Sequence, residues 1–433
     1  MRLFGTSGIR GIVTEDLIRL AFRVGLAVGS DCGRVVVGRD TRTSGDAMKH
    51  ALVSGLLAAG SECHDAGIVP TPTLALAAAR FDAGAMITAS HNPPQYNGLK
   101  LLNPDGSSFI SSQQQQLETA ISGGSFNIAS WDKMTASRKY DGAVEEHIAR
   151  IRRDFPSPLK LKVVLDCGCG AASVITPGLL RGLGCEVLAL DCYPSGRFPR
   201  DVEPTESNLG NLMRAVREYG AGLGLAHDGD ADRMMAVDDR GRFIPGDKLL
   251  AVLARTVAAK EVVTTIDASM AVDELGFNVK RTPVGDTAVS EELRNGGDFG
   301  AEPSGSWVFP GVSLCPDGIY AAAVLASVAS QQRLSALVDG IPSYPLRRGS
   351  VSGDGVAAEV LESSLMALGP LSASDIDGIR LDFGDGWLLV RPSGTEPKIR
   401  LTAEARDEAR AGELYEAGMK AVKTSINSEE MAD

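Results

Sequence analysis

Three carboxylates are crowded into the segment HDGDADR, residues 227–233. Asp228, Asp230 and Asp232 alternate with Gly229 and Ala231, and they follow an apolar run, AGLGLA, that is typical of a buried strand. Carboxylates this close repel one another, so without a counter-charge the pKa of at least one would rise. Because oxygen ligands suit a hard cation, the segment predicts a Mg²⁺ site.

Two other interpretations of this segment compete with a magnesium site. A calcium EF-hand is disfavoured because Arg233 replaces the required glycine and a strand, not a helix, precedes the loop. A merely acidic turn stays open from the sequence alone.

A possible nucleophile lies in MITASHNPPQYNGLK, residues 86–100. A strand predicted over residues 85–88 runs into Ser90, His91 and Asn92, and Pro93–Pro94 then forbids a helix. A serine held on such a turn projects its hydroxyl into a cleft. The alternative is an ordinary turn beside a proline corner, with Lys100 as a solvated charge at a strand end.

Two further loops carry groups that suit a phosphosugar. In GAEPSGSW, residues 300–307, Glu302 and Ser304 flank Pro303 and are suited to hydrogen bonds with sugar hydroxyls. Alone, that loop is no more specific than an ordinary turn. In RPSGTEPKIR, residues 391–400, the groups that would form a phosphate cradle are those of Arg391, Ser393, Gly394 and Thr395. The alternative for that segment is an ordinary hairpin end that carries polar residues and binds no phosphate.

A rival function comes from DCGCGAAS, residues 166–173. A strand followed by Asp-x-Gly-x-Gly resembles the first motif of S-adenosylmethionine-dependent methyltransferases, with Asp191 as a possible ribose partner. A lone Gly-x-Gly is weak, and this interpretation leaves the other four loops unexplained. A non-catalytic protein that binds sugar phosphates is a third possibility.

The elements that must position these loops alternate between strand and helix. GRVVVGRD, a helical pattern over residues 46–59, and SECHDAG form one unit, and KVVLDCG with LGCEVLALD and EVVTTIDAS with GFNVKRT begin two more. This alternation predicts right-handed crossovers and partly parallel sheets. The C-terminal part differs: DGIRLDF, WLLVRPS and PKIRLTAEA read as strands before a final helix.

The chain length of 433 residues predicts two to four domains. Pro and Gly near residues 154–158, 245–246 and 343–345 place boundaries that give segments 1–154, 155–245, 246–343 and 344–433. The predicted fold class is therefore α/β, with three similar mixed-sheet α/β domains and a small C-terminal α+β domain.

Composition narrows the location and the partners. A formal charge of −12 disfavours a nucleic-acid surface, and the most apolar run, residues 319–330, is shorter than the ~20 residues that span a bilayer. The N-terminus, MRLFGTSGIRG, has no signal-peptide pattern. Seven cysteines without metal-knuckle spacing are expected to be free thiols in a reducing cytoplasm.

Together, the loops resemble the α-D-phosphohexomutase family in content and order, from GTSGIRG at Gly5 through TASHNPP, DGDADR and AEPSG to RPSGTEP. The resemblance implies four domains around a central cleft. It also implies that Ser90 is the phosphoserine, and that Asp228, Asp230 and Asp232 hold Mg²⁺ together with an oxygen of the Ser90 phosphate.

The same resemblance implies roles for the remaining residues. Arg10, His91, Lys100 and Arg233 would lie near the transferring phosphoryl group. Sugar recognition would use Gly285, Asp286, Glu302 and Ser304, and the distal phosphate would contact Arg391, Ser393, Gly394 and Thr395. One departure is Ser306, which stands where many members have histidine.

The implied reaction interconverts hexose 6-phosphate and hexose 1-phosphate through a hexose 1,6-bisphosphate. Within the family, GTSGIRG and RPSGTEPKIR resemble the phosphoglucosamine mutase branch more than the phosphomannomutase branch, which implies glucosamine 6-phosphate as substrate. A phosphomannomutase or phosphoglucomutase with the same chemistry is the alternative. The partner is thus a small phosphosugar. The sequence leaves open the preferred hexose, the general base (Lys100 or His91), the oligomeric state and how Ser90 is first phosphorylated.

Overall fold

The structure is a computed structural model that describes residues 3–5, 7–124, 126–352, 358–392 and 398–430. Side chains of residues 358, 359 and 427–430 are outside that description. Among the helices in these ranges, none combines the length and the apolar character needed to cross a membrane.

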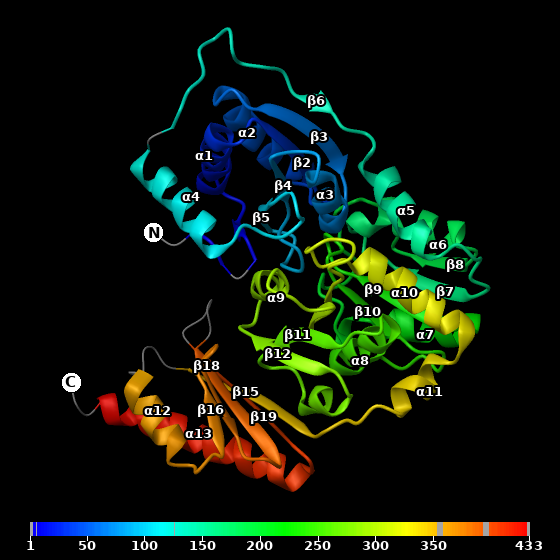
Figure 1. Ribbon diagram of the computed structural model, residues 1–433, viewed down its shortest axis with the longest axis vertical. Coiled ribbons are helices and arrows are strands. Elements are labelled where there is room, and N and C mark those ends of the chain that lie inside the picture. The colour runs from blue at the N-terminus through cyan, green and yellow to red at the C-terminus, as the bar shows by residue number, and fades with distance from the viewer. Residues whose placement is uncertain (1–2, 6, 125, 353–357, 393–397, 431–433) are drawn as a thin grey trace. The chain divides into compact units, whose positions relative to one another are not determined.

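The first sheet has six strands in the order β1-β5-β4-β2-β3-β6. Strands β2 to β6 are labelled in Figure 1. Strand β2 runs parallel to β3 and β4, whereas β5 runs antiparallel to β1 and β4, so the sheet is mixed as predicted. Its strands are β1 (Ile9–Ile12), β2 (Arg34–Arg39), β3 (Glu62–Ile68), β4 (Ala83–Ile87), β5 (Tyr96–Leu102) and β6 (Arg138–Lys139).

Helices cover both faces of this sheet. Val35 and Val37 pack into one core with α1, α2 and α4, while Val36 points to the opposite face and packs with α3. This alternation is the two-residue period of a strand buried on both sides. The helices are α1 (Glu15–Asp31), α2 (Gly45–Ala58), α3 (Thr71–Ala78), α4 (Ser111–Gly123) and α5 (Ala143–Asp154).

The second sheet has four strands in the order β10-β9-β7-β8. Strand β7 is parallel to β8 and β9, and β10 returns antiparallel to β9, which places the aspartate loop between two paired strands. The elements are β7 (Lys162–Asp166), α6 (Thr176–Gly182), β8 (Glu186–Leu190), α7 (Gly210–Tyr219), β9 (Leu223–His227) and β10 (Met234–Val237).

The third sheet has four strands in the order β12-β11-β13-β14. Its elements and the helices that follow are α8 (Gly246–Thr256), β11 (Glu261–Thr265), β12 (Asn278–Thr282), α9 (Asp286–Leu293), β13 (Phe299–Glu302), β14 (Ser306–Val308), α10 (Gly318–Gln331) and α11 (Leu334–Asp339). Helix α10 contains the most apolar run of the sequence, residues 319–330, and most of its residues are buried. It begins at a capping aspartate, Asp317, whose Oδ1 accepts hydrogen bonds from Ile319 N (3.0 Å) and Tyr320 N (2.8 Å).

The C-terminal sheet has five strands in the order β15-β19-β18-β17-β16, all antiparallel. The elements are β15 (Leu346–Ser352), α12 (Ala358–Met366), β16 (Ser372–Ser374), β17 (Ile379–Asp382), β18 (Gly386–Pro392), β19 (Lys398–Ala405) and α13 (Glu408–Glu430). The sequence indicated only three of these strands. It missed β15 and β16 because both are edge strands of mostly exposed polar or small residues.

The chain divides into two compact units, residues 1–262 with 285–340 and residues 263–284 with 341–433. Each of the four sheets also falls within one of the four segments predicted from Pro and Gly positions. The α/β class with three mixed sheets and a smaller C-terminal domain is confirmed, and the segment boundaries themselves stay a prediction.

Candidate active site

Ser90 lies on a strained turn just after β4. Its backbone φ is +48°, a left-handed conformation that is uncommon for a residue other than glycine. Its N–H donates to Thr88 Oγ1 at 2.8 Å, and the residue is only 1% exposed. The predicted turn is therefore present, and its backbone conformation fixes the direction of the Ser90 hydroxyl.

A buried arginine holds this turn from behind. The guanidinium of Arg42 donates through Nη2 to Ser90 O (2.8 Å) and Asn92 O (2.6 Å), and through Nη1 to Pro93 O (2.7 Å) and Tyr96 O (2.9 Å). Its Nε donates to Asp40 Oδ2 at 3.1 Å, so all five N–H donors are used. The sequence interpretation overlooked Arg42, because GRDTR reads as an ordinary strand end.

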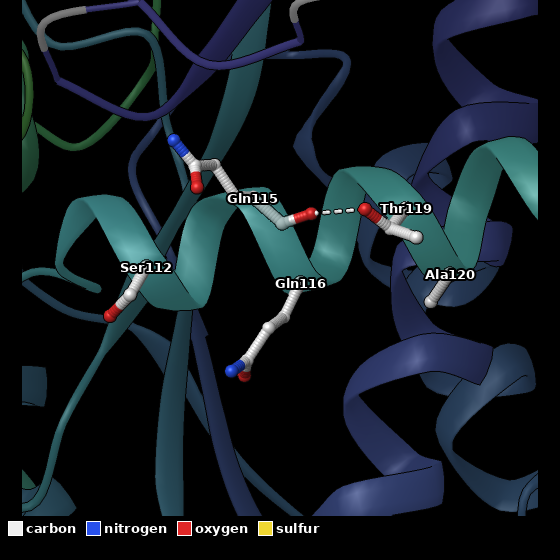
Figure 2. A pocket seen from close by; sticks show the side chains of 5 residues that line it. All are labelled: Ser112, Gln115, Gln116, Thr119 and Ala120. Atoms are coloured by element: carbon white, nitrogen blue, oxygen red, sulfur yellow. Dashed lines mark hydrogen bonds between the residues drawn. The ribbon is translucent and has the colours of Figure 1, made fainter.

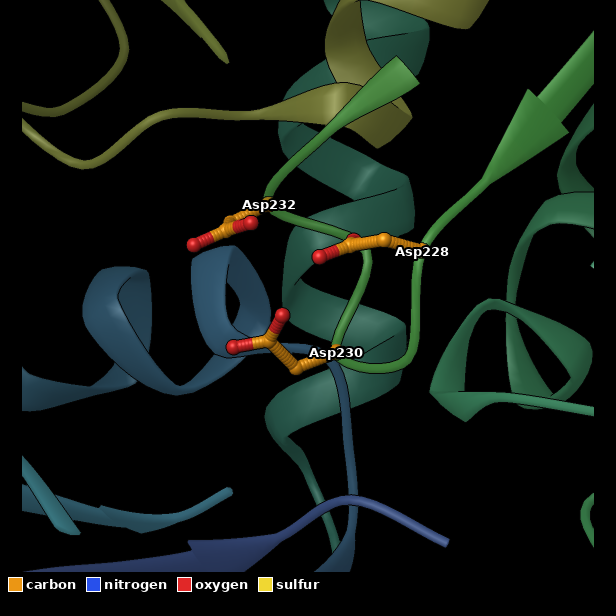
Figure 3. Close-up of side chains that lie close together, drawn as sticks. All are labelled: Asp228, Asp230 and Asp232. Atoms are coloured by element: carbon orange, nitrogen blue, oxygen red, sulfur yellow. The ribbon is translucent and has the colours of Figure 1, made fainter. Parts of the chain in front are cut away.

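The three aspartates converge in the loop between β9 and β10 (Figure 3). All are buried, and one carboxylate oxygen from each lies within 4.8 Å of the others. Ala231, between Asp230 and Asp232, has φ +58°, which turns the loop so that alternate side chains face one point. Among the described residues this is the one group of three or more such side chains with metal-ligand spacing.

The serine and the aspartates form one site. Ser90 Oγ donates a hydrogen bond to Asp228 Oδ2 at 2.7 Å, across 138 residues of chain. Asp228 Oδ1 in turn accepts from the backbone N–H of Arg233 at 3.3 Å. A phosphate on Ser90 would therefore extend into the aspartate cluster.

Two partners orient Asp230, one predicted and one not. Lys100 Nζ donates to Asp230 Oδ2 at 3.0 Å and also contacts Asp232 Oδ2. Thr71, the first residue of α3, donates its hydroxyl to Asp230 Oδ2 at 2.5 Å, and its N–H donates to Asp230 O at 2.9 Å. Thr71 was missed because only the fold brings α3 to this loop.

The donor set fits a magnesium ion. Asp230 Oδ1 and Asp232 Oδ1 are buried and have no hydrogen-bond partner in the described structure, an arrangement that is costly unless a cation binds there. Both are hard carboxylate oxygens, and so are the two oxygens of the neighbouring Asp228. This observation supports the predicted metal loop over a solvated acidic turn, because all three side chains are buried.

Burial and charge tune the titratable groups of this site. Burial, with the neighbouring carboxylates, raises the pKa of Asp228 above its usual range. Burial alone would lower the pKa of Lys100, but Asp230 and Asp232 outweigh it and raise that pKa, so Lys100 is a cation. Burial, together with Arg233, Arg10 and Lys100, lowers the pKa of His91 to about 2, so its ring is neutral.

The other predicted residues of the reacting end also gather here. His91 Nδ1 lies 3.3 Å from Ser90 Oγ, and Arg10 Nη1 donates to Asn92 Oδ1 at 3.0 Å. The Nε of Arg10 is buried without a partner in the described chain. Arg233 pairs with Glu203 at 2.7 Å. The cluster therefore carries several cations around the serine, which suits a phosphate.

The predicted sugar loops meet each other around Glu302. Glu302 Oε1 accepts a 2.9 Å hydrogen bond from the N–H of Gly285. The next residue, Asp286, accepts at Oδ2 from Ser7 Oγ at 3.1 Å, which joins the N-terminal GTSGIRG segment to this loop. Ser304 is exposed, whereas Ser306 is buried and forms a β-bridge with Arg233.

Arg391 lies in the C-terminal sheet, at the end of β18. Its Nη2 is 3.3 Å from Asp377 Oδ2, and its Nε is buried without a partner in the described residues. Arg400 on β19 stands directly opposite it in the register. These two arginines are cross-strand neighbours, and such a concentration of positive charge suits an anionic ligand. Ser393, Gly394 and Thr395 lie outside the described residues.

Two other features do not match this chemistry. The depression along α4 shown in Figure 2 offers no charged side chain; it is lined by Ser112, Gln115, Gln116, Thr119 and Ala120. In the methyltransferase-like segment, Asp166 is paired with Arg200 at 2.9 Å. A Cβ on Gly170 would lie 2.8 Å from Gly229 O, so the Gly-x-Gly turn packs against the aspartate loop.

Comparison with known proteins gives one consistent family. Models of the phosphoglucomutase/phosphomannomutase family match the chain in order: α/β/α domain I at residues 1–127, domain II at 143–241, domain III at 245–344 and the C-terminal domain at 355–421.

Individual relatives agree with these models. A probable phosphoglucosamine mutase of Methanosarcina acetivorans is 48% identical over 98% of this chain and all of its own length. A phosphoglucomutase/phosphomannomutase family protein from Burkholderia thailandensis superimposes with a TM-score of 0.86, at 29% identity over 97% of each chain. An N-acetylphosphoglucosamine mutase of Aspergillus fumigatus, solved in complex with GlcNAc-6P and magnesium, shares the fold with a TM-score of 0.65 at 15% identity, over 98% of this chain and 96% of its own.

Proposed function

The chain belongs to the phosphoglucomutase/phosphomannomutase family, and from that premise we propose that it converts glucosamine 6-phosphate to glucosamine 1-phosphate through a phosphorylated Ser90. Mutase activity of this kind is an intramolecular phosphoryl transfer, an isomerase reaction. Membership also removes the methyltransferase alternative, because the match covers all four domains.

The observation that carries the proposal is the 2.7 Å hydrogen bond between Ser90 Oγ and Asp228 Oδ2. It places the buried hydroxyl of Ser90, whose backbone is strained, beside three convergent carboxylates. Those carboxylates belong to a loop of a different sheet. A phosphomonoester on that oxygen would carry about −1.5 to −2 charges at neutral pH. Buried carboxylates next to such a group require a cation.

Asp228, Asp230 and Asp232 would hold a magnesium ion, together with an oxygen of the Ser90 phosphate. When bound, Mg²⁺ neutralises charge on the phosphoryl group and stabilises the charge that develops during transfer. The chain supplies the rest of the positive field through Lys100, Arg10 and Arg233. Stabilisation by such fixed groups in a water-poor site is usually the largest contribution to catalysis.

In the first transfer, a sugar hydroxyl oxygen bonds to the phosphorus of phosphoserine while the bond from phosphorus to Ser90 Oγ breaks. The hydroxyl proton must leave at the same time. Lys100 and His91 are the two side chains of the reacting end that could accept it: Lys100 is held by Asp230 and Asp232, and His91 Nδ1 lies 3.3 Å from Ser90 Oγ. The products are a hexosamine 1,6-bisphosphate and a free serine.

The second transfer restores the phosphoserine from the other phosphate of the same intermediate. The bisphosphate has to turn over so that its ends exchange places, and one distal cradle must then hold phosphate at either end of the sugar. We assign this cradle to Arg391 and its loop, with Arg400 beside it. Planar guanidinium groups bind phosphate through two parallel hydrogen bonds.

We assign recognition of the sugar amino group to Glu302. Glu302 is a buried carboxylate that accepts from Gly285 N, and a 2-ammonium group is better received near a fixed anion than a neutral hydroxyl. The Methanosarcina acetivorans relative, 48% identical, is a probable phosphoglucosamine mutase. Glucose or mannose phosphate, with the same chemistry, is the alternative substrate.

The test is a comparison of kcat/KM for glucosamine, glucose and mannose 6-phosphates, each with its own 1,6-bisphosphate as activator. We expect glucosamine 6-phosphate to be favoured by at least about tenfold, a difference of about 1.4 kcal/mol. A tenfold preference for glucose or mannose phosphate would overturn the substrate assignment and leave the mutase mechanism standing.

A further inference from the structure

Two thiols face each other at the ends of β7 and β8. Cys167 Sγ and Cys192 Sγ are 3.2 Å apart. Cys167 directly follows β7, and Cys192 comes shortly after the end of β8, the parallel neighbour of β7. Cys167 is fully buried, whereas Cys192 is partly exposed between the exposed residues Asp191 and Tyr193. All seven cysteines are free in the structure. Cys167 belongs to the DCGCGAAS segment and Cys192 follows β8, and the mutase mechanism uses neither thiol.

The backbone around Cys167 lies directly behind the active site. Ala171 N donates to Gly229 O at 2.8 Å, and a Cβ added to Gly170 would lie 2.9 Å from Asp228 O. On the other side, Thr41 Oγ1 donates to Cys169 O at 2.9 Å. Residues 167–171 therefore contact both the aspartate loop and the strand end that leads into Arg42.

We propose that Cys167 and Cys192 form a two-thiol oxidation site, which a low-molecular-weight disulfide converts into an intramolecular disulfide that weakens Mg²⁺ binding at the aspartate loop. The disulfide itself is independent of the proposed function. Its effect on the metal rests on the aspartate loop being the metal site of that function.

The oxidation proceeds by two exchanges that balance. The Cys192 thiolate attacks one sulfur of the oxidant, R–S–S–R, forming a mixed disulfide and releasing one R–S⁻. Cys167 Sγ then attacks Cys192 Sγ and releases the second R–S⁻. Two electrons pass from the cysteines to the oxidant, and the two cysteine protons end on the two released thiols.

The two thiols differ in pKa and exposure, and the difference matches the order of the two exchanges, with Cys192 reacting first. The hydrogen bond between them lowers the pKa of Cys192, the more exposed sulfur, which favours its thiolate as the first nucleophile. Burial raises the pKa of Cys167 well above its ordinary value. The buried thiol is thus shielded from an external oxidant and is placed to resolve a mixed disulfide on its neighbour.

Closing the bond draws the two cysteines toward each other. A disulfide needs an S–S distance of about 2.05 Å, so the sulfurs have to approach by roughly 1 Å from their present 3.2 Å. Interiors are close-packed and transmit such shifts. Because Gly170 and Ala171 already touch the aspartate loop, a shift of Cys167 changes the positions of the carboxylates.

Peptide mass spectrometry tests the disulfide on the full chain treated with oxidised glutathione. Trypsin releases peptides 163–181 and 182–197, each with two cysteines: Cys167 and Cys169 in one, Cys185 and Cys192 in the other. We expect these peptides to be linked in the oxidised protein and separated by dithiothreitol. The link should persist in Cys169→Ser and Cys185→Ser and vanish in Cys167→Ser and Cys192→Ser.

Calorimetric titration with Mg²⁺ alone tests the consequence without any turnover. We expect the oxidised protein to bind Mg²⁺ about tenfold more weakly than the reduced protein, the loss typical when support behind a metal ligand is disturbed. Cys192→Ser should show the same affinity before and after glutathione treatment. Absence of the linked peptide, or equal Mg²⁺ affinity with the link formed, would overturn the proposal. Either result leaves the mutase assays unaffected, so failure here is distinct from failure of the proposed function.

Discussion

The guanidinium of Arg42 donates a 2.8 Å hydrogen bond to the backbone carbonyl oxygen of Ser90. It is one of four bonds from the same buried side chain to carbonyls of the turn, and the turn holds Ser90 at φ +48°. A strained backbone persists only where its surroundings over-determine it. Arg42 supplies that constraint, and the position of the nucleophilic oxygen depends on it.

Replacement of this arginine should therefore impair chemistry more than binding. In Arg42→Lys the charge remains but the planar fork is lost, and misplacement of Ser90 Oγ by about 1 Å is expected to lower kcat on the order of 10²-fold. KM should change little, because the distal cradle is intact. Thermal unfolding of the variant is the control, and an unchanged kcat in a folded variant would show that Arg42 does not position Ser90.

Metal binding should depend on Thr71 as well as on the aspartates. Chelation is expected to abolish turnover and Mg²⁺ to restore it, and Asp230→Asn should weaken Mg²⁺ binding.

Thr71→Val removes the hydroxyl that orients Asp230 Oδ2, and should weaken Mg²⁺ binding by about 10- to 100-fold. Thr73→Val is the matched control, since Thr73 lies on the same helix but bonds His147. Equal losses in both variants would mean that α3 is merely destabilised.

The distal cradle can be separated from the reacting end. Arg391→Ala removes a charged hydrogen bond worth about 1.5–3 kcal/mol, so KM for the phosphosugar should rise by roughly 10- to 100-fold. Phosphate on Ser90 should be unaffected. Arg348→Ala, an exposed arginine of the same sheet, is expected to behave like the unaltered chain. Steady-state kinetics and intact-protein mass decide, and a normal KM in Arg391→Ala would place the cradle elsewhere.

Local composition was sufficient to pick out most of the residues that the structure brings together around Ser90. The aspartate and serine loops can be recognised because reactive residue types are concentrated in a few positions. The alternation of strand and helix patterns predicted the α/β class. Thr71 and Arg42 could not be found in this way, because their partners lie 159 and 48 residues away and their own surroundings look like ordinary element ends. Edge strands such as β15 were missed for a related reason: a mostly exposed strand carries little apolar pattern.

The central claim is that Ser90 carries the phosphoryl group during turnover. The direct measurement is a single-turnover reaction with glucosamine 1,6-bisphosphate labelled in its phosphates, followed by tryptic mapping. Peptide 81–100 contains one serine, Ser90, so the label can be assigned by fragmentation. We predict label on Ser90 in the unaltered chain and none on this peptide in Ser90→Ala, which should also lose nearly all turnover. Label on any other residue, or full turnover by Ser90→Ala, would contradict the account.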